Sequence, residues 1–99
     1  MSVETRLDSG VLHIKIGGRF DFGVHNEFRD AVKLAETGVQ KIVVDMSLTE
    51  YLDSSALGML LVLRDKIGGD RNAVQITGAR AEVKKILEIA NFDKLFAVA

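Results

Sequence analysis

The feature that most constrains the fold is an alternation of strand-like and helix-like segments along the 99 residues. Two strand-like segments come first, and after them amphipathic helical stretches alternate with short apolar runs. Strands separated by helices need crossover connections, which make such strands parallel within one sheet. We therefore expect an α/β fold in the order ββαβαβα(β), in which the bracketed final strand is short.

The N-terminal segment has the pattern of a hairpin. Residues 3–7 alternate between apolar or small and charged side chains, which predicts a first strand with one buried face. Residues 8–10 form a turn signal, and residues 11–16 alternate again as a second strand. So short a connection predicts an antiparallel pair, so the whole sheet should be mixed.

The middle of the chain predicts one helix and one central strand. We interpret residues 19–23 as a connecting loop and residues 24–37 as an amphipathic helix that Gly38 closes. The β-branched run at residues 42–44, which precedes Asp45, is typical of a strand covered on both faces.

The second helix follows a lead-in at residues 47–52. It is apolar around much of its circumference over residues 56–63, so we expect it to be deeply packed, and a Gly-Gly pair at residues 68–69 should stop it. The expected C-terminal elements are a strand, a helix, one extra turn and a last strand, at residues 73–77, 79–91, 93–95 and 96–99.

A Ser- and Asp-rich turn precedes the second helix. Asp53, Ser54 and Ser55 lie where side-chain oxygens can bind free helix N–H groups, so one interpretation is that they only cap the helix. A hydroxyl there is also half exposed and faces the positive end of the helix dipole, which favours an attached phosphoryl group. Sites in α/β sheets collect at the carboxyl ends of parallel strands, where we expect this turn to lie.

The run Asp53-Ser54-Ser55-Ala56-Leu57-Gly58, after a short hydrophobic strand, resembles the signature of the STAS domain family. More narrowly, it is similar to that of the bacterial anti-sigma factor antagonists. The order of elements also resembles the STAS fold, so we expect a single STAS domain at residues 1–99. The resemblance implies that a partner kinase phosphorylates Ser55, with Ser54 as the alternative. Ala56 stands where the family usually has Gly, and since Ala is the better helix former we expect a stiffer helix start.

The same resemblance implies a surface that faces the partner. Arg19-Phe20-Asp21 resembles the segment in which these antagonists carry an Asp beside the phosphorylatable Ser. Gly58 either lets a partner's backbone approach or packs closely on the domain's own sheet. Family members usually continue into a final helix, and a docking contact through that helix is not expected in a chain that stops at Ala99. The expected partner-binding residues are Asp21, Asp53, Ser54, Ser55, Ala56 and Gly58.

The function that the resemblance implies is an anti-sigma factor antagonist in a partner-switching circuit. Its implied partners are a serine kinase of the histidine-kinase-like ATPase fold, which also sequesters a sigma factor or other output protein, and a PP2C-type phosphatase. The unmodified protein would hold the kinase. Phosphorylation of Ser55 would add about −1.5 to −2 charges beside Asp53 and release it. The alternative is a constitutive accessory subunit of a transporter or signalling scaffold, without a switch.

Residue patterns argue against an enzyme. There is no Gly-x-Ser-x-Gly elbow, and no motif ties His13 or His25 to a serine. No His and carboxylate spacing suggests a metal, and the absence of Cys excludes disulfides and thiol chemistry. We expect no catalytic residue, metal or cofactor, and ATP would belong to the kinase.

Charge and hydropathy limit the remaining partners. A net charge of −1 gives no indication of nucleic acid or an anionic membrane. The longest apolar run, residues 56–63, is far shorter than the roughly 20 residues of a membrane helix. Residues 1–10 lack the apolar segment of a secretory signal, so we expect a cytoplasmic protein without membrane insertion.

Overall fold

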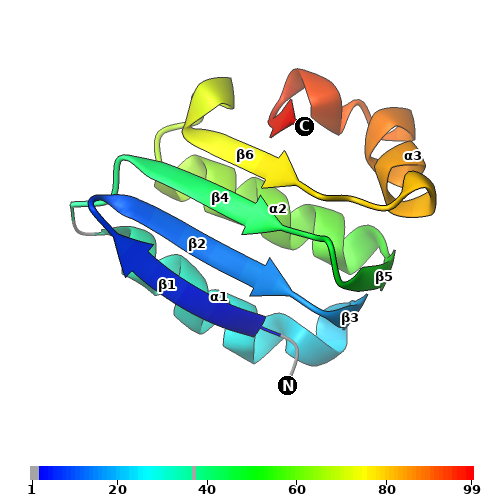
Figure 1. Cartoon of the computed structure of the whole chain (residues 1–99), viewed down its shortest axis with the longest axis horizontal. Helices are drawn as coiled ribbons and strands as arrows, with labels where there is room; N and C mark the ends of the chain where they lie inside the picture. Colours follow the sequence, from blue (N-terminus) through cyan, green and yellow to red (C-terminus); the bar gives the residue numbers. More distant parts are fainter. Residues whose placement is uncertain (1–2, 37) are drawn as a thin grey trace.

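The computed structural model describes residues 3–36 and 38–99, apart from the side chain of Glu36. These residues form a five-stranded sheet in the order β1-β2-β4-β6-β7, a separate two-stranded sheet of β3 and β5, and helices that pack on them (Figure 1). The strands are β1 (Val3–Asp8), β2 (Val11–Ile16), β3 (Gly18–Phe20), β4 (Lys41–Asp45), β5 (Thr49–Leu52), β6 (Val74–Thr77) and β7 (Ala97–Val98). The α-helices are α1 (His25–Lys33), α2 (Ser54–Lys66) and α3 (Ala81–Ile89).

The large sheet is mixed, as predicted. Strands β1 and β2 form an antiparallel hairpin, and β2, β4, β6 and β7 are parallel neighbours. Ser9 and Gly10 turn the hairpin with φ angles of 51° and 81°, which is the left-handed backbone that a two-residue turn of this twist requires. The expected α/β class and the expected order of its main elements are confirmed.

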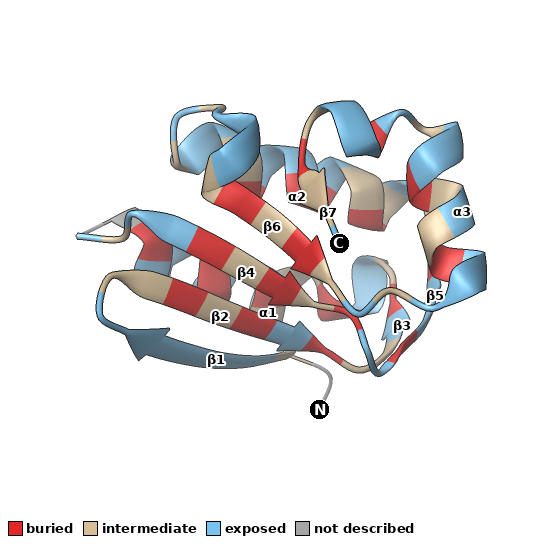
Figure 2. Cartoon of the chain, turned by 45° about the horizontal axis from the view of Figure 1, so that its top comes forward, coloured by how far each residue is buried: buried red, intermediate tan, exposed pale blue. Residues whose placement is uncertain are grey.

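The core lies between the large sheet and two helices. Figure 1 shows α1 and α2 behind the sheet, and Figure 2 shows buried residues alternating with less buried ones along β2, β4 and β6. Ile42 and Val44 are fully buried, whereas Val43 between them is only half-buried because it faces away from the helices. The prediction that this strand is covered on both faces is therefore wrong. Val favours any pleated, half-buried surface, so a β-branched run does not require two covering layers.

The first strand is more exposed than its pattern predicts. From Glu4 to Asp8 every residue of β1 is exposed, and Leu7 retains 56% of its accessible surface. The alternation does place residues 3, 5 and 7 opposite the buried positions of β2. However, β1 is the edge strand and the helices cover it only in part, so the predicted buried face is wrong.

Two short strands were not predicted. β3 lies in the stretch interpreted as a loop, and β5 lies in the expected lead-in to α2. They pair in parallel with each other, apart from the large sheet. Strands of three and four residues carry little periodicity, and each exists because the other is beside it.

Both predicted central helices have different limits or burial in the structure. α1 ends at Lys33 and continues as a 3₁₀ turn over Leu34–Glu36, so the α-helix stops before Gly38; residue 37 lies outside the described residues. α2 buries one side through Ala56, Met59, Leu60 and Leu63, but Leu61 and Val62 are exposed. The deep packing expected for α2 is therefore right for one side only, since a helix on a single sheet has a free outer side.

The C-terminal elements agree with the sequence. β6 and α3 occupy the expected positions, a 3₁₀ turn follows at Phe92–Lys94, and β7 ends the sheet. The Ala99 N–H donates to the Ile76 carbonyl oxygen at 2.9 Å and extends the pairing of β7 with β6. Over the described residues, no helix has the length and apolar character needed to span a bilayer.

Candidate functional site

The candidate site is built on the ends of the two short parallel strands. Phe20 of β3 pairs with Leu52 of β5, so the residues that follow them, Asp21 and Asp53, leave the small sheet side by side. The Asp53 N–H donates to the Phe20 carbonyl oxygen at 3.4 Å. The structure thus brings together two expected site residues that are far apart in the sequence.

Both carboxylates cap the helical turn that follows them. The Asp21 Oδ1 accepts the Gly23 N–H at 2.9 Å, and the Asp53 Oδ1 accepts the Ala56 N–H at 3.0 Å. The Asp53 carbonyl oxygen also accepts the Leu57 N–H at 3.2 Å, which closes the first turn of α2. Asp53 is therefore the N-cap of α2.

The two serines follow this cap without taking part in it. Ser54 and Ser55 are the first two residues of α2; Ser54 is exposed and Ser55 is half-buried. Among the residues that the structure describes, neither hydroxyl has a hydrogen-bond partner. The capping interpretation therefore holds for Asp53, and the Ser55 hydroxyl is left at the surface without a structural task.

An arginine neutralises one of the two carboxylates. The Arg19 Nε lies 3.3 Å from the Asp21 Oδ2, and the Arg19 guanidinium carbon lies 4.4 Å from the centre of the Tyr51 ring. Arg19 and Tyr51 are register partners on β3 and β5. No pattern in the sequence indicates this cation–π pair, because it depends on the pairing of two strands that were not predicted.

Exposed apolar side chains lie on or directly beside the same short elements. Phe22, Leu48 and Tyr51 keep 67%, 50% and 40% of their surface exposed. Phe22 follows Asp21 and stacks on the ring of His25, with ring centres 4.9 Å apart. Exposed rings beside polar residues are typical of a protein-binding surface.

The first turns of α2 also separate buried from open positions. Ala56 is fully buried. Gly58 is exposed, and a Cβ added to it would meet no atom within 4 Å. The interpretation that Gly58 packs closely on the domain's own sheet is therefore wrong, and the space beside the Gly58 Cα is open.

Two polar contacts fix the connection that brings β5 to this position. The buried Thr49 hydroxyl donates to the Ile16 carbonyl oxygen at 2.6 Å and so joins the small sheet to β2. The Asp45 Oδ1 accepts the Ser47 N–H at 2.8 Å. Hydrogen bonds from the Ser47 backbone and side chain lower the pKa of Asp45 below its ordinary value of 3.8.

Within the described residues, no group of three or more His, Asp or Glu side chains could hold a metal ion. The two histidines lie on different elements, with His13 on β2 and His25 at the start of α1. The arrangement offers a hydroxyl, two capping carboxylates and exposed rings, which is chemistry for binding and modification.

A helix-backed mixed sheet, with an Asp-Ser-Ser helix start at the ends of two parallel strands, is the arrangement expected of a STAS protein. Residues 3–97 match the family described as "Mlab, STAS domain", so the chain belongs to the STAS domain family. It is also similar to a STAS-domain containing protein of Pseudomonas aeruginosa (strain UCBPP-PA14), with 48% identity over 93% of this chain and 91% of that protein.

Solved structures show the same fold at low sequence identity. A putative anti-sigma factor antagonist from Thermotoga maritima superposes with a TM-score of 0.83 at 17% identity, over 97% of this chain and 84% of that one. The anti-sigma factor antagonist SpoIIAA matches in its unphosphorylated form (TM-score 0.71; 94% of this chain and 96% of that one). Its phosphorylated form, from Bacillus, matches too (TM-score 0.76; 99% and 91%), and both are 14% identical to this chain. The chain therefore has the fold of SpoIIAA.

Proposed function

We propose that this protein is an anti-sigma factor antagonist that works as a phosphorylation switch at Ser55. In the unmodified state it binds a kinase that is also the anti-sigma factor, and phosphorylation of Ser55 releases that partner. The observation that carries the proposal is the Ser55 hydroxyl, which lies at the start of α2 without a hydrogen bond to any described residue. A kinase can modify such a group without first breaking a contact within the domain.

The charge distribution around Ser55 explains how a phosphate would act. Asp53 already occupies the Ala56 N–H, so a phosphate on Ser55 lacks this helix donor and meets the carboxylate of Asp53 instead. A partner seated on the unmodified surface would face about −1.5 to −2 added charges. A loss of about 3 kcal/mol in binding corresponds to more than a hundredfold in affinity.

The proposed contact surface consists of the exposed and half-exposed groups around α2 and the small sheet. Ser54 and Gly58 would contact the partner directly, and Asp21 and Asp53 would lie at the border of the contact. Ala56 is fully buried, so it would contribute only through its N–H bond to the Asp53 cap. Gly58 supports the proposal because the space beside it is open, so the backbone of a partner could approach α2 there.

The switch we propose is local. SpoIIAA has structures in both the unphosphorylated and the phosphorylated form, and this chain matches both folds. This supports a mechanism in which modification changes one docking surface while the domain keeps its fold. The proposed kinase has the histidine-kinase-like ATPase fold and supplies ATP, and a PP2C-type phosphatase restores Ser55. We also propose that the protein acts in the cytoplasm and has no catalytic residue of its own.

The test is the intact mass of the protein isolated from its native cells across growth conditions. We expect a phosphoryl increment in the wild type and in Ser54→Ala, and none in Ser55→Ala. The pair of variants is matched, since the two serines are adjacent and neither caps the helix.

The other outcomes separate the alternatives. An increment that is lost in Ser54→Ala and kept in Ser55→Ala moves the switch to Ser54. If the wild type is unmodified under every condition and still binds a partner protein, the switch is contradicted. That result favours a constitutive accessory subunit of a transporter or scaffold.

A further inference from the structure

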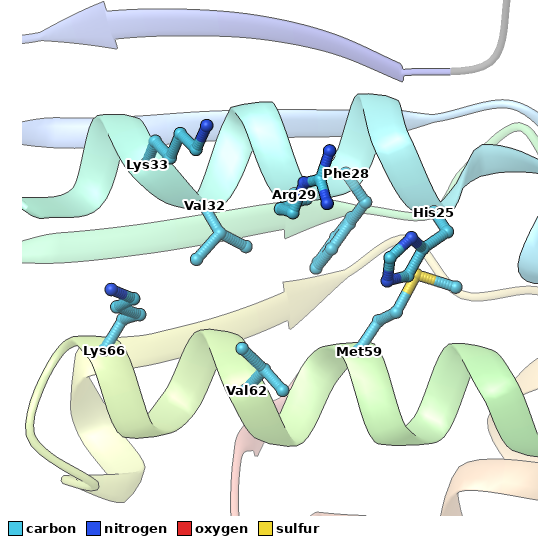
Figure 3. A pocket seen from close by; sticks show the side chains of 8 residues that line it. All are labelled: His25, Phe28, Arg29, Val32, Lys33, Met59, Val62 and Lys66. Atoms are coloured by element: carbon cyan, nitrogen blue, oxygen red, sulfur yellow. The ribbon is translucent and has the colours of Figure 1, made fainter.

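A groove lies between α1 and α2, on the side of the helices that faces away from the sheet (Figure 3). Its volume is about 350 Å³. Its apolar lining comes from Phe28 and Val32 of α1 and from Met59 and Val62 of α2, and the figure shows these side chains reaching toward the space between the helices. Val62 keeps 54% of its surface exposed and offers most of the accessible apolar surface, since Phe28, Val32 and Met59 keep only 1%, 4% and 8%.

The rim of the groove is cationic. Arg29 and Lys33 project from α1 and Lys66 from α2, and Figure 3 shows Lys33 and Lys66 at the same end of the groove. No Asp or Glu is among the lining residues. No described carboxylate forms an ion pair with Arg29 or Lys33. Lys66 already makes an interaction of its own, so the positive charge offered to a ligand is that of Arg29 and Lys33. The chain as a whole carries 14 acidic and 13 basic residues, so this local charge is a property of the groove and not of the composition.

The dimensions of the groove suit a short stretch of helix. Its lining residues run from His25 to Lys33 on α1 and from Met59 to Lys66 on α2. At about 1.5 Å per residue this is a length of roughly 10–12 Å, or two helical turns. Two turns present two apolar side chains at positions i and i+4, which can enter an apolar groove while flanking residues reach its rim.

We propose that this groove is a docking site for an acidic amphipathic helix of a partner protein. Two apolar side chains of that helix would pack on Val32, Met59 and Val62, and its Asp or Glu residues would pair with Arg29 and Lys33. The inference is independent of phosphorylation at Ser55.

The test uses the full chain and a helix-stabilised synthetic peptide of about 15 residues, with Leu at i and i+4 and Glu beside them. Binding is followed by amide chemical shifts of the ¹⁵N-labelled protein. We expect shifts centred on Arg29, Val32 and Val62, and at least a tenfold weaker affinity for Val62→Glu and for Arg29→Glu. The matched control is Ile89→Glu on α3, which replaces another exposed apolar residue and should leave the affinity unchanged.

Three results would overturn the proposal. The first is equal binding of a peptide in which every Glu is replaced by Lys. The second is co-sedimentation with phosphatidylglycerol vesicles that Val62→Glu abolishes, in the absence of peptide binding. The third is a dimer in analytical ultracentrifugation that Val62→Glu dissociates, which would assign the groove to a second copy of the chain. As a control, the amide spectrum of each variant is recorded to establish that it is folded. A loss of binding is then not caused by unfolding.

Discussion

At the scale of single residues, the start of α2 has one residue that caps the helix and two whose hydroxyls stay free of the cap. Asp53 holds the first turn of α2 through the Ala56 N–H, while the hydroxyls of Ser54 and Ser55 make no hydrogen bond within the described part of the domain. Three consecutive residues that all have good capping side chains thus have different tasks. The consequence is that the serines are available for modification at little structural cost.

This division predicts the stability of three variants. Asp53→Ala should lower the free energy of unfolding by about 1 kcal/mol, because it removes the N-cap. Ser54→Ala and Ser55→Ala should change it by less than about 0.5 kcal/mol, since Ala is a good helix former and no hydrogen bond is lost. Urea denaturation measures all three, with Asp53→Asn as the control that keeps a capping oxygen. A loss at Ser55→Ala as large as that at Asp53→Ala would show that the serine is part of the cap.

At the scale of elements, α2 has one side for the core and another for the surface. Its buried side packs on the sheet, while Gly58 and Val62 stay exposed on the outside. Helix stability argues against Gly at an exposed interior position, where it is less favourable than Ala by about 1 kcal/mol. The partner contact proposed at Gly58 would account for a glycine at this position.

Gly58→Ala should accordingly stabilise the isolated protein. Its new Cβ would meet no atom within 4 Å, so the gain in helix propensity of about 0.5–1 kcal/mol is not offset by a clash. Thermal unfolding should show a midpoint raised by a few degrees.

The contrasting control is Gly78→Ala. Gly78 has a φ of +71°, and its added Cβ would lie 3.0 Å from the Ser47 Cβ, so this change should lower the midpoint. A lower midpoint for Gly58→Ala as well would mean that Gly58 is required by the fold itself.

At the scale of the whole molecule, the site depends on how the small sheet is attached to the large one. The Thr49 hydroxyl, which is fully buried, links β5 to the end of β2 through the Ile16 carbonyl oxygen. β3 follows β2 after a single residue and pairs with β5. This joint sets where Asp21 and Asp53 leave the small sheet.

Thr49→Val should weaken the joint. It leaves a buried carbonyl oxygen without its hydroxyl donor, at a cost of about 1–3 kcal/mol, which is several degrees in the unfolding midpoint of a domain of this size. Thr49→Ser keeps the hydroxyl and should recover most of the stability. If Val were as stable as Thr at this position, the hydrogen bond would not be what holds the two sheets together.

Much of the fold could be predicted from the sequence because local patterns determine it. Alternation over residues 11–16 marks β2, helical spacing over residues 24–35 marks α1, and a Ser-Gly turn marks the hairpin. The same holds for the Asp-Ser-Ser helix start, whose residues are adjacent in the chain.

Features that need contacts between distant segments could not be predicted from the sequence. β3 and β5 are too short for a pattern of their own, and each becomes a strand through the other. The exposure of β1 and the open face of β4 follow from where α1 and α2 lie on the sheet. The spacing of apolar residues does not indicate where a helix packs. The Arg19–Tyr51 pair and the groove between the helices likewise arise from packing. Local sequence patterns thus set the longer helices and strands and the chemistry of the helix start, while packing set the two short strands and the surfaces on which that chemistry can act.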